Sequence, residues 1–489
     1  MDYEAVIGLE VHAQLLTASK MFCSCDADVF AAPPNTHVCP VCLGMPGSLP
    51  VINRRAIEAT IMTGLALNCQ IAEASVFVRK NYSYPDLPKG YQISQYELPL
   101  CHDGWLLIEV GGERKRIGIH RAHQEEDTGK LFHVNGYSLV DYNRAGVPLL
   151  EIVSEPDLRS ADEAYAYLTK LRTILRYLGV STGDMEKGAM RCEPSVSVRP
   201  IGSSELGTKV EIKNLNSFRA VKLALEYEIG RQMEALRRGE KIAQVTMGWD
   251  DVRGRTVVQR VKEGSEDYRY FPEPDLPPLE VSREWVAEIA ARLPELPDAK
   301  RDRFMAQYGL SAYDASVLAT DREVADYFEN VVAATGGKAE AKTVANWFTG
   351  ELFRLMNETE ASIGQVKVTP EAFAGLLALV ADGTVNLNTA KMVFEEMFRT
   401  GARAQEIVAA KGLAQVSDRD VLERAVRATL AAHPAEVASY HGGKTTVLGW
   451  LMGQVMRETK GKANPTIVRA LLEEELALLQ RSRGNTGHS

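Results

Sequence analysis

The sequence of 489 residues contains no uninterrupted apolar run of the ~18 residues that a membrane-spanning helix needs. Its first residues, Met1-Asp2-Tyr3-Glu4, lack the basic and apolar regions of a secretory signal. These absences predict a soluble cytoplasmic protein with no membrane partner. The content of 45% hydrophobic and 25% charged residues is typical of globular proteins, and the length suits roughly three domains.

Glycine-rich nucleotide-binding loops are also missing. The string His441-Gly-Gly-Lys-Thr-Thr446 resembles a Walker loop, but Ala438 stands where its first glycine is required. No Gly-x-Gly-x-x-Gly follows a predicted strand, and no serine amidase signature is found. If the protein uses ATP, metal ions and cationic side chains must therefore hold the phosphates. Any glutaminase activity must come from another chain.

Positive charge is scarce in the chain as a whole. The net charge of −9 excludes a molecule whose entire surface binds nucleic acid. Residues 411–489 differ, because 11 Lys and Arg against 8 Asp and Glu give this part a net charge of +3. So small an excess is compatible with local RNA contact, but it is also typical of an ordinary solvated surface.

Cysteines are few and unevenly spread. Four of the seven lie within twenty positions, in the pairs Cys23-Ser-Cys25 and Cys39-Pro-Val-Cys42. In a reducing compartment such paired cysteines indicate a metal site, and four thiolates suit a closed, tetrahedral, structural Zn²⁺ site. His37 is an alternative ligand for one of the four positions. The other interpretation is four unrelated buried thiols.

Periodicity predicts an α+β body followed by helices. Residues 3–15 alternate as a half-buried strand does, and Ser160 with Glu163 predicts the start of an amphipathic helix. Beyond residue 283 the pattern is helical. We therefore expect a body with a mostly antiparallel sheet over residues 1–292, a helical domain at 293–408 and a helical tail at 409–489. Further strands are predicted at 105–110, 116–120, 148–153, 196–199 and 209–212, and helices at 54–67, 160–178 and 217–238.

Acidic residues in predicted strands are the main candidates for chemistry. Glu10 and His12 share one face of the first strand, and Glu151 interrupts an apolar strand. Glu125 lies in the polar string His120–Asp127. Carboxylates with an imidazole suit Mg²⁺ or Mn²⁺ and leave room for phosphate oxygens. The alternative is a sheet face held by salt bridges.

The segment 79–95 mixes cations, aromatic residues and turn residues without a core period. This composition predicts a surface loop. Lys80 and Lys89 are candidates for phosphate contact, and tyrosines such as Tyr82 could stack on a base. A merely polar loop is the alternative.

These motifs resemble one family, the B subunits of heterotrimeric aspartyl/glutamyl-tRNA(Asn/Gln) amidotransferases. The resemblance extends from about residue 3 to about residue 478, and such long strings are highly specific. The strings that carry it are Val6–His12, Arg79–Tyr82, Tyr91–Gln95, His123–Asp127, Glu151–Asp157, Asp267–Asp275, Leu293–Pro297, Gly453–Met456 and Lys460–Pro465.

The resemblance implies a body similar in fold to the catalytic domain of glutamine synthetase and guanidino kinases. It implies a ligase subunit that uses ATP to phosphorylate the side-chain carboxylate of Glu-tRNA(Gln) or Asp-tRNA(Asn). Ammonia then displaces the phosphate. The ammonia would come from an amidase A subunit through a tunnel, and a small C subunit would clamp the pair.

The resemblance also implies roles for individual residues. Mg²⁺ would be held by Glu10, His12, Glu125 and Glu151. ATP would contact Lys80 and Tyr82, and the ammonia path would be lined by Lys80, Lys89 and Asp275. The tail would contact tRNA.

The chain departs from the family pattern at three places. Ser83 stands where an aromatic residue is common. Arg191-Cys-Glu-Pro-Ser195 replaces a usual Arg-Cys-Asp-x-Asn string, so an acid is kept at Glu193 and an amide is lost at Ser195. Gln244–Trp249, with Val245 and Met247, replaces a string that usually contains arginine. The competing hypothesis is a tRNA-docking scaffold without chemistry of its own. Which mischarged tRNA is the substrate depends on the synthetases of the cell.

Overall fold

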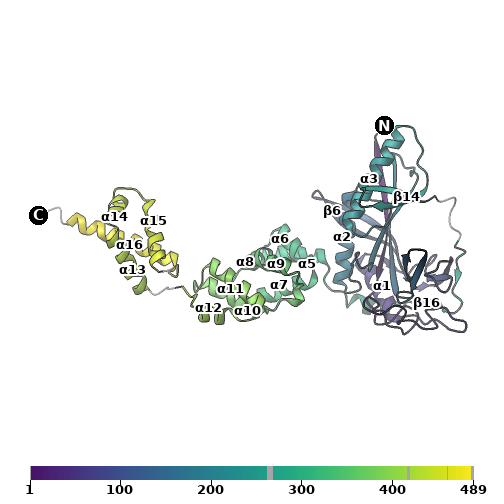
Figure 1. The fold of residues 1–489 in the computed structure, drawn as a ribbon, viewed down its shortest axis with the longest axis horizontal. Helices are drawn as coiled ribbons and strands as arrows, with labels where there is room; N and C mark the ends of the chain where they lie inside the picture. The colour runs from purple at the N-terminus through teal and green to yellow at the C-terminus, as the bar shows by residue number, and fades with distance from the viewer. Residues whose placement is uncertain (1, 262–267, 416–418, 460, 486–489) are drawn as a thin grey trace. The chain divides into compact units, whose positions relative to one another are not determined.

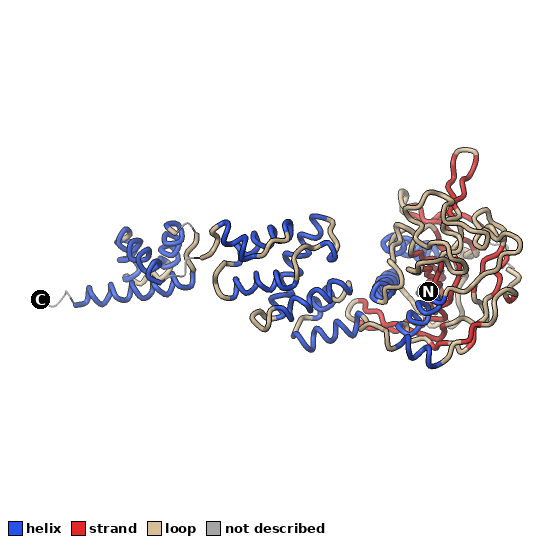
Figure 2. The backbone as a smooth tube through the Cα atoms, turned by 90° about the horizontal axis from the view of Figure 1, so that it is seen from below, coloured by secondary structure: helices blue, strands red, loops and turns tan. Residues whose placement is uncertain are grey.

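The computed structural model describes residues 2–261, 268–415, 419–459 and 461–485, which leaves Asp267 and Lys460 of the family strings outside the described residues. The chain forms two compact units, Met1–Pro297 and Asp298–Ser489, here called the body and the helical unit (Figure 1). Strands lie in the body, and the helical unit contains only helices in its described part (Figure 2). The expected α+β body with a helical C-terminal region is confirmed, and no described helix is long and apolar enough to span a membrane.

A nine-stranded sheet forms the centre of the body, in the order β14-β13-β12-β11-β1-β10-β7-β6-β2. Neighbours are antiparallel except for β12 and β13, which run parallel. The antiparallel character expected from the sequence is confirmed. The strands are β1 Tyr3–Gln14, β2 Gln70–Ile71, β6 Cys101–Val110, β7 Glu113–Glu126, β10 Pro148–Ser154, β11 Met190–Pro200, β12 Val210–Lys213, β13 Val245–Asp250 and β14 Arg255–Val261.

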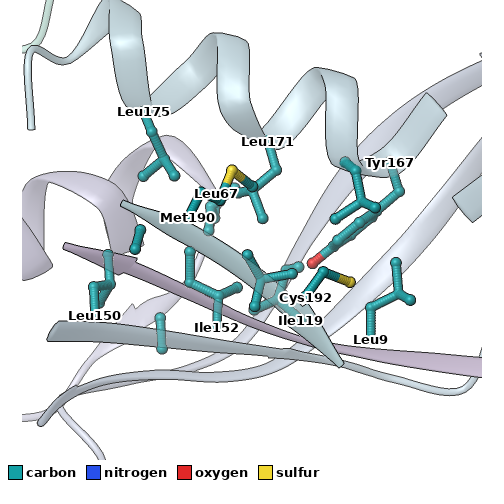
Figure 3. Packing of buried hydrophobic residues seen from close by; sticks show 14 of the residues in the cluster. Leu9, Leu67, Ile119, Leu150, Ile152, Tyr167, Leu171, Leu175, Met190 and Cys192 are labelled. Carbon is teal, nitrogen blue, oxygen red and sulfur yellow. The ribbon is translucent and has the colours of Figure 1, made fainter. Parts of the chain in front are cut away.

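Three helices cover one face of this sheet: α1 Arg54–Ala66, α2 Ala161–Tyr177 and α3 Phe218–Arg237. Figure 3 shows Leu171 and Leu175 of α2 pointing at the apolar side chains of the strands below. On β1, Leu9 and Val11 belong to this core, so period-two alternation turns Glu10 and His12 to the opposite face. The core thus fixes which face carries the polar groups.

A β-bulge reverses the alternation of β7. Ile117 and Ile119 lie in the core under the helices, yet Arg121 two residues further faces the opposite side with the polar groups. The register between β10 and β7 shifts after Val153, where His120 is the extra residue. On the neighbouring strand β6, Asp103 has a φ of 53°, next to this shift. Bulges of this kind re-aim the side chains that follow them.

Residues 79–95 are not a surface loop throughout, and that expectation was wrong at both ends. β4 Val78–Asn81 and β5 Tyr91–Ser94 pair with each other, and β15 Phe271–Pro272 completes a three-stranded sheet. β15 lies almost two hundred residues away from β4 in the sequence, so local composition did not reveal its place in the sheet. The remaining short sheets pair β3 Ala74–Ser75 with β16 Leu279–Glu280 and β8 Lys130–Val134 with β9 Tyr137–Asp141.

The described part of the helical unit has two separate hydrophobic cores. One extends from Phe304 to Val408 and the other from Leu422 to Leu476. The helices are α5 Pro297–Tyr308, α6 Ala312–Leu318, α7 Arg322–Ala334, α8 Ala341–Trp347, the π-helix Phe348–Leu352, α9 Phe353–Thr359, the 3₁₀ helix Ile363–Gln365, α10 Pro370–Ala381, α11 Leu387–Thr400, α12 Ala404–Lys411, α13 Arg419–Ala432, α14 Pro434–His441, α15 Val447–Glu458 and α16 Pro465–Asn485; helix α4 Arg283–Ala290 belongs to the body.

Candidate functional site

Three neighbouring strands bring the predicted metal ligands together. His12 on β1 lies opposite Glu151 on β10, and Glu151 lies opposite His123 on β7. Glu10 and Glu125 stand two residues further along their own strands, on the same face. All four predicted ligands are therefore brought to one place on the sheet.

The side-chain atoms of this carboxylate–histidine cluster lie close together. His12 Nε2 is 3.4 Å from Glu151 Oε2, 3.7 Å from Glu10 Oε1 and 3.9 Å from Glu125 Oε2. His123 Nε2 is 3.6 Å from a carboxylate oxygen of both Glu125 and Glu151. His123 was not predicted as a ligand, although its spacing of two residues from Glu125 in a strand is a signal that could have found it.

Electrostatics keep the inner part of the cluster ionised. Burial raises the pKa values of Glu125 and Glu151. The positive charge of Lys80 near Glu125, and of His123 and His12 near both carboxyl groups, has the larger opposite effect, so both pKa values lie below the usual range. Burial lowers the pKa of His12, but the three carboxylates around it raise that pKa to about 9. The cluster thus holds buried negative charge that only protonated side chains or a bound cation can balance.

The donor set fits a divalent cation. Two groups of three ligand atoms, one from Glu10, His12 and Glu151 and one from His123, Glu125 and Glu151, each lie within 4.8 Å of one another. Carboxylate oxygens with few imidazoles suit Mg²⁺ or Mn²⁺. Glu151 belongs to both groups, so it is the central residue of the cluster.

Glu10 forms the open rim of the cluster. Its side chain is 42% exposed, yet the surrounding protein withdraws the carboxyl partly from water. This partial burial and the charge of Glu151 raise the pKa of Glu10 to about 6. Glu193, at the first departure from the family pattern, lies opposite Glu10 and pairs with Lys213 at 2.7 Å. Ser195 lies opposite Gly8, beyond the cluster.

A second layer of side chains orients Glu125. Its carboxylate accepts hydrogen bonds from Ser94 Oγ at 2.6 Å and from Gln92 Nε2 at 3.1 Å, and the Tyr82 hydroxyl donates to Gln92 Oε1. Lys80, on β4, lies over the Tyr268 ring at 5.1 Å. Burial lowers the pKa of Lys80, but Glu125 and Glu151 raise it above its ordinary value, so the ammonium stays charged beside the cluster.

The four cysteines meet in the loop between β1 and α1. The sulfur atoms of Cys23, Cys25, Cys39 and Cys42 lie within 4.8 Å of one another. This four-sulfur set fits the tetrahedral ligand set of Zn²⁺. The ring of His37 is not part of the group, and its backbone carbonyl instead accepts a hydrogen bond from Lys20 Nζ at 2.7 Å.

The charge of a buried lysine supports this sulfur cluster. Lys20 Nζ is 3.6 Å from Cys42 Sγ, and its side chain is fully buried. The Cys23 thiol, the Cys39 N–H and Lys20 together lower the pKa of Cys42 to about 4, whereas burial raises that of Cys25 to about 11. The nearby ammonium therefore favours the ionised form of the Cys42 thiol.

Lys89 and Asp275 line a cavity of ≈ 60 Å³ beside the sulfur cluster, whereas Lys80 is not among the described residues that line it. Lys89 forms an ion pair with buried Glu126, which also accepts the Ile93 N–H. Gly44 has a φ of +66°, and a Cβ there would overlap Lys89. The sulfur loop therefore closes tightly over this lysine.

Comparison with known proteins identifies the family of the chain. A model of the GatB/GatE catalytic domain matches residues 5–287, and a model of the GatB domain matches residues 326–476. Similar proteins, described as the B subunit of aspartyl/glutamyl-tRNA(Asn/Gln) amidotransferase, occur in Moorella thermoacetica, with 56% identity over 97% of this chain and 100% of that protein, and in Thermodesulfovibrio yellowstonii, with 55% identity over 96% and 99%. The chain therefore belongs to the family of aspartyl/glutamyl-tRNA(Asn/Gln) amidotransferase B subunits.

Proposed function

We propose that this chain is the ligase subunit that activates a mischarged aminoacyl-tRNA with ATP and then amidates it. The observation that carries the proposal is the convergence of three carboxylates and two imidazoles on one sheet face. A docking scaffold has no need of such a costly concentration of buried charge. A body fold like that of glutamine synthetase and guanidino kinases remains part of the proposal.

In this proposal Mg²⁺ is held by Glu10, His12, Glu125 and Glu151, with His123 as an additional ligand. Mg²⁺ supplies charge neutralisation and orientation for the phosphates of ATP. The protein's own part is to keep these ligands ionised and fixed. Ser94, Gln92 and Tyr82 support that role because they hold the Glu125 carboxylate in one orientation.

The phosphorylated side chain of Glu-tRNA(Gln) or Asp-tRNA(Asn) is a good acyl donor, because phosphate leaves more readily than oxide. Ammonia, delivered from glutamine by an amidase A subunit, then attacks the acyl carbon and phosphate departs. Lys89 and Asp275 line the cavity that would belong to the ammonia path. Lys80, beside Glu125 and Glu151, is proposed as a further residue of that path. Tyr82 is proposed as a nucleotide contact as well as a support for Gln92.

The remaining parts of the proposal concern partners and location. A small C subunit completes the complex, residues 409–489 contact the tRNA, and the complex works in the cytoplasm. Zn²⁺ at Cys23, Cys25, Cys39 and Cys42 is structural, since four protein ligands leave no position for substrate. The weak positive charge of the tail suits recognition of RNA shape and backbone.

Glu125→Gln tests the proposal in the reconstituted complex with its partner subunits. The change keeps the size of the side chain but removes the charge, so formation of ADP in the presence of mischarged tRNA should be abolished while tRNA binding persists. Glu155→Gln is the control, because the Glu155 carboxylate is exposed and pairs with the exposed His120 at 3.0 Å, outside the cluster. ADP formation at the normal rate in Glu125→Gln would favour the docking scaffold instead.

A further inference from the structure

The guanidinium of Arg121 borders the carboxylate–histidine cluster but forms no hydrogen bond with its described residues. Arg121 Nη2 is 3.9 Å from Glu151 Oε1, which is too long for a hydrogen bond. Its Nε is buried and has no hydrogen-bond partner among the described residues. Buried donors are nearly always paired, so this N–H is a donor that a bound anion or a water molecule can satisfy. Neither the sequence motifs nor the family comparison assigns a role to this arginine.

One tyrosine contacts the guanidinium, and a second tyrosine supports the first. Arg121 Cζ lies 5.4 Å from the centroid of the Tyr96 ring, and Tyr96 stacks on Tyr270 with ring centroids 4.3 Å apart. The bulge at His120 is what turns Arg121 to this side of the sheet. The guanidinium is thus fixed by aromatic contact, while its hydrogen-bond donors remain available.

Arg121 stands at the open end of the cluster. The sheet register places it in one row with Val153 and Glu10, two strands apart, so about 10 Å separates the Arg121 and Glu10 backbones. At this end Tyr96 is exposed and the Glu10 side chain is partly exposed, whereas Glu125 at the other end is 3% exposed. Arg121 thus lies at the more exposed end of the cluster, where an anionic ligand can reach it from solvent.

We propose that Arg121 is a catalytic residue that binds the γ-phosphoryl group of ATP during its transfer, an inference that rests on the proposed function. In this step a carboxylate oxygen of the aminoacyl side chain forms a bond to the γ-phosphorus. The bond from that phosphorus to the bridging oxygen breaks, and its electron pair leaves with ADP. No proton or electron is exchanged with Arg121, whose planar fork matches two phosphoryl oxygens.

The competing explanation is that Arg121 only balances the charge of Glu151. The two explanations differ in whether a lysine at position 121 can take over the function of the arginine. A lysine supplies the same charge, but it has no planar pair of donors for a phosphoryl group. Charge balance alone therefore predicts normal activity for Arg121→Lys, whereas phosphoryl binding predicts a large loss.

The test compares wild type, Arg121→Ala and Arg121→Lys in the full complex with its partner subunits. We expect kcat for ADP formation with mischarged tRNA to fall at least about 100-fold in both variants. Added guanidinium at millimolar concentration should restore part of the activity of Arg121→Ala and none of that of Arg121→Lys. Arg116→Ala is the matched control, since Arg116 lies on the same strand and stacks on Trp105 at 4.8 Å, outside the cluster.

A binding measurement provides a readout apart from activity. Inorganic phosphate is titrated into the complex with ADP and Mg²⁺, and Arg121→Ala should weaken its binding about tenfold, as loss of a charge-assisted contact does. Normal ADP formation and normal phosphate binding in Arg121→Lys would overturn the role assigned to Arg121 and would leave the proposed function intact. A wild-type complex that forms no ADP would instead overturn the proposed function beneath it.

Discussion

Lys20 shows how one buried side chain stabilises a charged site. The ammonium has no water contact, and it donates to the His37 carbonyl and lies next to Cys42 Sγ. A buried ammonium is tolerated only where it meets negative charge and acceptors. Lys20 therefore links the sulfur atom of Cys42 to the backbone at His37, within the loop that carries the four cysteines.

Lys20→Met should weaken zinc retention. Methionine keeps an apolar stem but removes the ammonium, and loss of such an outer partner typically costs about 10–100-fold in metal affinity. Release of Zn²⁺ to a colorimetric chelator measures the change. Lys187→Met is the control, because Lys187 is exposed and forms a surface pair with Asp184. Equal retention by both variants would contradict the role of Lys20, and a folded wild type without zinc would contradict the zinc site itself.

Glu329 of helix α7 is the acidic centre of an ion-pair group in the helical unit. Arg303 donates to its two oxygens at 2.6 and 2.9 Å, and Lys300 and the Tyr308 hydroxyl lie within 3.4 Å. The hydrogen bonds from Arg303 lower the pKa of Glu329 below its value in an unfolded chain. The stabilisation is therefore complete above the unfolded pKa and is lost as the pH falls through the lower, folded pKa.

Glu329→Gln should accordingly reduce the melting temperature of the helical unit at pH 7. The difference from wild type should shrink as the pH falls below the ordinary glutamate pKa of 4.5 and should vanish in stronger acid. Calorimetric scans across this range measure it. Glu358→Gln is the control, since Glu358 forms an exposed pair with Arg354 one helical turn away, and exposed pairs contribute little to stability. A difference that stays constant with pH would exclude the assigned cause.

At the scale of elements, the placement of α2 over the sheet depends on a defined helix start. Ser160 Oγ accepts the Glu163 N–H at 3.1 Å, as the sequence predicted. The Glu163 carboxylate accepts the N–H of Arg159 rather than that of Ser160, so the capping box is displaced by one residue. The cap fixes where Tyr167, Leu171 and Leu175 meet the strands (Figure 3).

Ser160→Ala should destabilise the body by about 1 kcal/mol, because one helix N–H loses its partner. Urea unfolding followed by a probe in the body measures the change as a lower midpoint at constant slope. Thr173→Ala, within the same helix, is expected to change stability by about a few tenths of a kcal/mol at most. Its hydroxyl only donates a hydrogen bond to the Thr169 carbonyl, which already lies within the helix. A midpoint that is unchanged in Ser160→Ala would show that packing alone positions α2.

On the scale of the whole molecule, the hydrophobic cores are separate. The core of the body contains residues from Ala5 to Ile289, and the helical unit has its own two cores. Separate cores allow separate unfolding transitions. The carboxylate–histidine cluster, the four cysteines and the cavity beside them are all built from residues of the body.

Phe373→Ala should lower the melting temperature of the helical unit in calorimetry and leave the melting temperature of the body unchanged. Phe373 is fully buried among Phe348, Trp347 and Phe394, and its removal should cost about 3–5 kcal/mol in the helical unit. Leu171→Ala, in the core of the body, is the reciprocal variant and should shift the other transition. If either change lowered both transitions equally, the two units would unfold as one.

The sequence by itself determined the local elements and the residue types available for chemistry. Alternation along 3–15 predicted β1 and the common face of Glu10 and His12, and Ser160 predicted the start of α2. The spacing of the four cysteines predicted their grouping. These features succeeded because each depends on interactions between residues close in the chain.

Only the tertiary structure decided which distant groups meet. The bulge at His120 turns Arg121, His123 and Glu125 to the face of Glu151, and its register shift is set against the partner strand β10. The pairing of β4 with β15 is likewise long-range. A one-residue shift moves every following side chain to the other face, and no local pattern records where such a shift occurs. Four of the five members of the cluster were therefore readable as candidates, but their meeting, the addition of His123 and the place of Arg121 beside them required the folded sheet.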